Sequence, residues 1–169
     1  TDLRLQLQVL ESSSVRDDAA IKAIEDQLRN LQVLAGTVPV TGPGVVISIE
    51  DPEGSGGPDT LIDIVQELRD AGAEAIGING RRFGVSSALT EDDGRPVLDG
   101  AALRSPFQVL AIGQAATLEG GLKIPVGAVD SLTSLRGVSV EGERTAQPDI
   151  PALTRAPTFT TARPVGSGG

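Results

Sequence analysis

Residues 70–82 constrain the fold more than any other stretch of the chain. They read Asp-Ala-Gly-Ala-Glu-Ala-Ile-Gly-Ile-Asn-Gly-Arg-Arg. Gly72 is typical of a helix end, because glycine readily adopts the left-handed conformation that closes a helix. The residues from Ala73 to Asn79 then read as a buried strand, and Asn79-Gly80 is a turn signal. A helix that leads directly into a buried strand predicts an α/β connection.

The same stretch contains a compact polar cluster. Asn79 ends the predicted strand, and Arg81 and Arg82 follow it within three positions. One hypothesis is a ligand-binding module in which these three residues hold a carboxylate or a phosphate, since arginine binds both groups through paired N–H donors. The alternative is that Asn79-Gly80 only forms a turn and that the arginines pair with surface acids.

An apolar seam runs through the N-terminal part of the chain. Ile21, Ile24, Leu28 and Leu31 are spaced 3, 4 and 3 residues apart, which is the a/d pattern of a coiled coil. Residues 3–10 alternate like a strand but consist mainly of helix formers, so we expect a helix there as well. Two heptads are short for an isolated coiled coil. The seam therefore either packs on its own domain or is the end of a longer coiled coil. In the second case the four residues are candidates for an oligomer interface.

Helices and strands alternate in the remainder of the chain. Thr60 and Asp63 suggest a capping box for a helix that ends near Ala71 and buries Leu61, Ile64, Val65 and Leu68. Two further helical pieces are expected at 115–122 and 126–135, on either side of Pro125. A hairpin turn is expected at residues 91–94, between strands 85–89 and 96–98. The main strands are expected at 45–49, 73–79, 106–112 and 138–141.

This element order predicts the fold class. A β-α-β unit, a hairpin and a second β-α-β unit are typical of the ferredoxin-like split β-α-β sandwich, an α+β fold in which an antiparallel sheet carries two helices on one face. The first and third main strands should then lie in the middle of the sheet. Three segments result: an N-terminal helical or coiled-coil segment (1–36), the ferredoxin-like α+β domain (37–153), and a Pro/Thr/Gly-rich tail with the composition of a disordered segment (154–169).

The amino-acid composition argues against several classes of function. The chain has no His and no Cys, so it lacks the usual general base, the thiolate nucleophile and the common zinc ligands. Its net charge of −9 argues against nucleic acid and anionic lipid surfaces as partners. The acidic loop at 50–58 does not match an EF-hand and is expected to be solvated. We expect no catalytic residue, no cofactor and no metal site.

An enzyme is the least favoured hypothesis. Acylphosphatases share the split β-α-β pattern and use an arginine and an asparagine to stabilise a phosphoryl group. Those residue types occur together at Asn79, Arg81 and Arg82, but the phosphate loop of acylphosphatases is missing.

Several segments resemble the bacterial domain of unknown function numbered 881. The resemblance follows the order of that family over residues 20–153. The matching segments are Ala35-Gly36, Pro39-Val40-Thr41-Gly42-Pro43-Gly44-Val45, Glu67-Leu68-Arg69, Ala71-Gly72-Ala73-Glu74-Ala75-Ile76, Ile78-Asn79-Gly80, Arg82, Ser105-Pro106-Phe107, Ala111-Ile112-Gly113, Leu118, Leu122, Leu132 and Ile150-Pro151-Ala152.

The resemblance implies a location and a type of function. Members of the family typically carry a membrane-spanning helix, then a coiled coil, then this domain on the extracytoplasmic side. Some are encoded in cell-division gene neighbourhoods, and no catalytic activity is established for them. We therefore expect a non-enzymatic structural or interaction protein of the bacterial envelope, linked to division or sporulation. Its expected partners are envelope proteins, including a second copy of itself, and it would meet the membrane only through an anchor absent from this chain.

Overall fold

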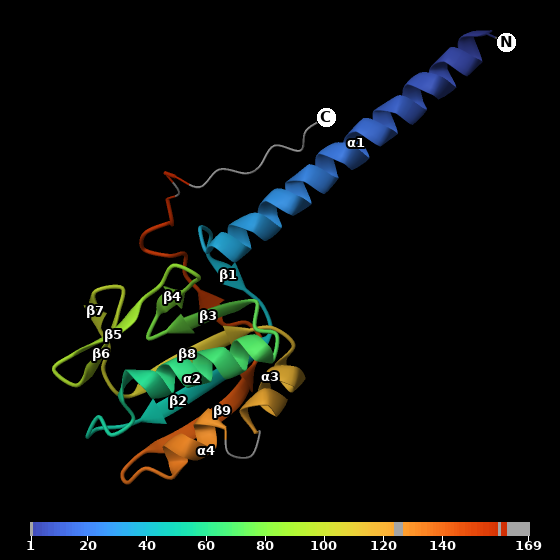
Figure 1. The fold of residues 1–169 in the computed structure, drawn as a ribbon. Coiled ribbons are helices and arrows are strands. Elements are labelled where there is room, and N and C mark those ends of the chain that lie inside the picture. Colours follow the sequence, from blue (N-terminus) through green and yellow to red (C-terminus); the bar gives the residue numbers. More distant parts are fainter. Residues whose placement is uncertain (1, 124–126, 159, 162–169) are drawn as a thin grey trace.

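The computed structural model describes residues 2–123, 127–158 and 160–161. It shows an α+β protein in which an N-terminal helix leads into antiparallel sheets (Figure 1). Helix α1 (Asp2–Ala35) projects away from the sheets, and residues 3–10 belong to it, as their composition predicts. The helix ends at Gly36, where φ is 69°, a conformation that favours glycine.

The central sheet has five strands in the order β4-β3-β8-β2-β9, and all neighbours are antiparallel. The apolar strands β2 and β8 are paired inside the sheet, as the sequence predicts for the first and third main strands. β9 forms one edge and the short strand β4 forms the other. The strands are β2 (Gly44–Glu50), β3 (Ala75–Ile78), β4 (Arg81–Phe83), β8 (Phe107–Ile112) and β9 (Ser139–Thr145).

Three helices cover one face of this sheet: α2 (Gly57–Asp70), α3 (Ala115–Leu122) and α4 (Ala128–Thr133). Their inward side chains and those of the strands form the main core. Burial of this apolar surface is the dominant favourable contribution to folding. The four side chains that α2 buries are the predicted ones, Leu61, Ile64, Val65 and Leu68.

The opposite sheet face is covered in part. Strands β1 (Val40–Thr41) and β10 (Asp149–Ile150) pair with each other, and Ile150 packs against Ala75 and Ile112. A Cβ atom at Gly77 would lie 3.2 Å from Ile150 Cγ2. The small side of β3 therefore leaves room for Ile150 to approach closely.

The segment between β4 and β8 forms a separate three-stranded sheet of β5 (Leu89–Asp92), β6 (Arg95–Leu98) and β7 (Ala101–Ala102). The turn between β5 and β6 lies at Asp93-Gly94, where both φ angles are positive, as the Asp-Gly signal predicts. The first strand begins at Leu89 and not at residue 85. The carboxylate of Asp99 explains this difference, because it accepts hydrogen bonds from Ser87 Oγ and from the N–H of residue 88 and holds that segment in a turn.

The start of α2 differs from the expected capping box. The helix begins at Gly57, three residues before Thr60, and no side chain caps its first turn. The carboxylate of Asp51 instead accepts hydrogen bonds from the backbone N–H groups of Ser55 and Gly56, at 2.8 Å each. Asp51 is only 5% exposed, so the loop at 50–58 is not simply solvated, as its composition suggested.

The described part of the predicted tail, residues 154–158 and 160–161, contains no helix and no strand. The remaining residues of that tail, 159 and 162–169, lie outside the described residues.

Candidate functional site

Helix α1 carries a stripe of exposed apolar side chains. Ile21, Ile24, Leu28 and Leu31 are 56%, 66%, 55% and 55% exposed. Of the two arrangements that the sequence left open, the seam does not pack on its own domain. Large apolar side chains that remain exposed along one helix are typical of a surface that binds a partner.

Asn79 forms part of the framework of the domain. It has a φ of 48°, and with Gly80 it makes the turn between β3 and β4. Its amide Nδ2 donates to the carbonyl of Arg104 at 2.9 Å, and its Oδ1 accepts from the N–H of Gln108 at 2.7 Å. Both polar atoms of this side chain therefore hold the segment that leads into β8.

Arg81 and Arg82 do not converge on one site with Asn79. They are consecutive residues of β4, so their side chains point to opposite faces of the sheet: Arg81 is exposed and Arg82 is 5% exposed. Arg82 Nη2 donates to the carbonyl of Val33 at 2.9 Å, which ties β4 to the last turn of α1. Burial lowers the pKa of Arg82. Its Nη1 is buried and has no hydrogen-bond partner among the described residues.

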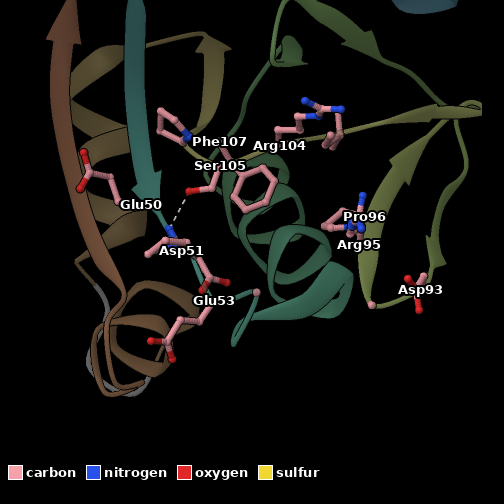
Figure 2. A pocket seen from close by; sticks show the side chains of 14 residues that line it. Glu50, Asp51, Glu53, Asp93, Arg95, Pro96, Arg104, Ser105 and Phe107 are labelled. Atoms are coloured by element: carbon pink, nitrogen blue, oxygen red, sulfur yellow. Dashed lines mark hydrogen bonds between the residues drawn. The ribbon is translucent and has the colours of Figure 1, made fainter.

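A cleft of about 800 Å³ lies between three segments of the chain (Figure 2). One wall is the β2–α2 loop, with Glu50, Asp51 and Glu53. The other wall comes from the β5–β6 turn, from β6 and from the segment before β8, with Arg95 and Arg104. Asp51 N donates to Ser105 Oγ at 2.8 Å and joins the two walls at their base. Pockets of a few hundred to about 1,000 Å³ are the size that small ligands occupy.

The cleft was not identified from the sequence. Its residues come from three segments that are each unremarkable alone, and only the fold brings them together. Within the described ranges, no group of three or more acidic, histidine or cysteine residues is placed to hold a metal ion. Among the described helices, none combines the length and the apolarity that a membrane crossing needs.

The fold thus defines an α+β domain carried on a projecting amphipathic helix. A family model described as "Bacterial protein of unknown function (DUF881)" matches residues 27–163. The chain belongs to this family, which confirms the resemblance seen in the sequence.

The chain is similar to several proteins named UPF0749 and to a solved structure. UPF0749 protein Rv1825 of Mycobacterium tuberculosis is 37% identical over 168 residues, which are 97% of this chain and 57% of that protein. UPF0749 protein YlxW of Bacillus subtilis is 33% identical over 119 residues, covering 64% of this chain and 51% of that protein. A crystal structure of an uncharacterized conserved protein from Mycobacterium tuberculosis superposes with a TM-score of 0.73 at 37% identity, over 82% of this chain and 99% of that one. The chain spans a little over half the length of the two UPF0749 proteins.

Proposed function

We propose that this protein is a non-enzymatic structural and interaction protein of the bacterial envelope, and that α1 joins it to a second copy of itself. The exposed seam on α1 carries this proposal. Fully burying a Leu or Ile side chain contributes about 1.5–3 kcal/mol, so pairing four such side chains would offset much of the cost of association.

The heptad pattern extends beyond these four residues. Leu3, Leu7 and Leu10 occupy the same heptad positions in the sequence, and only Ser14 and Asp17 interrupt the series. All of these residues lie in one uninterrupted helix. A pattern that follows a single helix over more than four turns supports a coiled coil better than two heptads alone do.

The location and the link to cell division are supported by family membership. Helix α1 projects away from the sheets, which would suit an envelope protein whose domain reaches partners at a distance (Figure 1). Fractionating cells that produce the protein would test the location. Recovery in the cytosolic fraction alone would contradict it.

We also propose that the domain is a ferredoxin-like split β-α-β sandwich. The strand order β3-β8-β2-β9 and the connections β2-α2-β3 and β8-α3-α4-β9 support this assignment, with β4 and the small sheet as an insertion. An experimental structure in which β2 and β8 are not neighbours would contradict it.

Substitution of Ile24 and Leu28 by serine should abolish self-association. The two side chains lie at the centre of the seam, and hydroxyl groups at core positions cannot replace their apolar contacts. Light scattering at increasing concentration should show a dimer or higher oligomer for the unchanged chain and a monomer for the variant. Circular dichroism should show that the domain remains folded in both.

Val15→Ser is the matched control, because Val15 lies on the same helix, is 67% exposed and falls outside the a/d positions. This variant should associate like the unchanged chain. If the unchanged chain is a monomer at high concentration, or if Val15→Ser disrupts the oligomer as strongly as the double variant, association through the seam is wrong.

A further inference from the structure

The cleft separates its charges by sign. Glu53 lies on one side, with Glu50 beside it and its carboxylate directed away from Phe107, and Arg95 and Arg104 lie on the other side (Figure 2). Asp93, at the tip of the β5–β6 turn, is the exception on the arginine side. Within the described chain, the ion pairs are Arg29–Asp26, Lys123–Glu119 and Arg144–Glu119, so none of the charges in the cleft is neutralised by a protein partner within 4 Å.

The base of the cleft is apolar. Pro96, Leu103 and Phe107 line it and are buried beneath the two charged walls. Pro106 lines it as well and is exposed. An apolar base between oppositely charged walls suits a ligand that has an apolar centre and two charged ends.

The walls are held in place by the framework of the domain. The buried Asp51 organises the β2–α2 loop through Ser55 and Gly56 and donates its own N–H to Ser105 Oγ. Asn79 Nδ2 binds the carbonyl of Arg104. A site whose loops are already ordered loses less conformational entropy when a ligand binds.

From this arrangement we infer that the cleft binds a short extended peptide that carries one cationic and one anionic side chain around an apolar centre. The cationic group lies against Glu53 and within the field of Glu50, the anionic group lies against Arg95 and Arg104, and the apolar centre lies on Phe107 and its neighbours. A purely anionic ligand would meet the repulsion of the glutamates, and a purely cationic ligand that of the arginines. Arginine suits the anionic end because its paired donors match a carboxylate.

Two blocked peptides serve as probes, acetyl-Lys-Val-Val-Glu-amide and acetyl-Glu-Val-Val-Lys-amide, because the direction of the bound chain is left to the experiment. Calorimetry and backbone amide chemical shifts of the full chain should show saturable binding of at least one of them, with shifts at the cleft. Replacing either charged residue of that peptide by Gln should weaken binding about tenfold, and added salt should weaken it further.

Each wall is tested by a double variant. Glu50→Gln with Glu53→Gln, and Arg95→Gln with Arg104→Gln, should each weaken binding of the charged peptide about tenfold. The matched controls are Glu141→Gln with Glu143→Gln on β9, and Arg81→Gln with Arg136→Gln, which change exposed charges outside the cleft. The controls should bind like the unchanged protein.

Three results would overturn the inference. The first is no saturable binding of either peptide at millimolar concentration. The second is equal binding of the Gln-substituted peptides. The third is loss of affinity in only one of the two wall variants, which would indicate a site for a single charge.

Discussion

Replacing Gly44 by alanine should lower the free energy of unfolding by at least about 3 kcal/mol. A Cβ atom at this position would lie 1.9 Å from the carbonyl oxygen of Ala111 and 2.9 Å from its carbonyl carbon. Gly44 is paired with β8 on one side and β9 on the other, so β2 cannot move away from Ala111 without disturbing a second ladder. Urea unfolding monitored by circular dichroism should show the loss as a lower transition midpoint.

The matched control for this change is Gly142→Ala. Gly142 lies on the edge strand β9, its φ is not positive, and a Cβ atom there would meet no other atom within 4 Å. The same substitution should therefore change stability by no more than about 0.5 kcal/mol. Equal transition midpoints for Gly44→Ala and the unchanged protein would show that β8 yields easily at Ala111, contrary to the argument.

Gly44 shows what a local pattern can and cannot predict. The run Thr-Gly-Pro-Gly at residues 41–44 indicates a turn, and a strand does follow it. Gly44 is nevertheless the first residue of β2, and the carbonyl that excludes a side chain there belongs to a residue 67 positions later (111 − 44). Requirements set by such distant neighbours do not appear in the pattern around the glycine.

The predictions that the structure confirms depend on residues close in sequence, and those that it corrects depend on more distant residues. The buried face of α2 and the turn at Asp93-Gly94 depend on residues close in sequence, and both were predicted. The start of α2 depends on Asp51, which reaches Ser55 and Gly56 from the preceding loop, and the rule for a Ser/Thr cap did not anticipate it. The cleft depends on three loops and could not be assembled without the fold.

The sequence alone argues against a single ligand site that contains both Arg81 and Arg82. Arg81 and Arg82 are adjacent, and adjacent residues of a strand point to opposite faces of the sheet. Once Arg81–Phe83 is recognised as a strand, the two guanidinium groups can no longer be assumed to share one ligand. The turn at Asn79-Gly80 and its pairing with β3 were the available signal.

Asn79→Ala should lower the free energy of unfolding by about 2–3 kcal/mol. The substitution removes the hydrogen bonds to the Arg104 carbonyl and from the Gln108 N–H, each worth about 1 kcal/mol. It also places an alanine at a φ of 48°, where asparagine and glycine are better tolerated. Hydrogen exchange gives a specific readout, because the Gln108 amide loses its acceptor and should exchange faster than its neighbours in β8.

Asn79→Gly separates the two contributions. Glycine accepts the positive φ but cannot form either side-chain hydrogen bond, so this variant should lose about 2 kcal/mol and still expose the Gln108 amide to exchange. If Asn79→Gly is as stable as the unchanged protein, the side chain does not hold the segment before β8. Asn79 would then no longer count as the residue that positions Arg104 through the backbone.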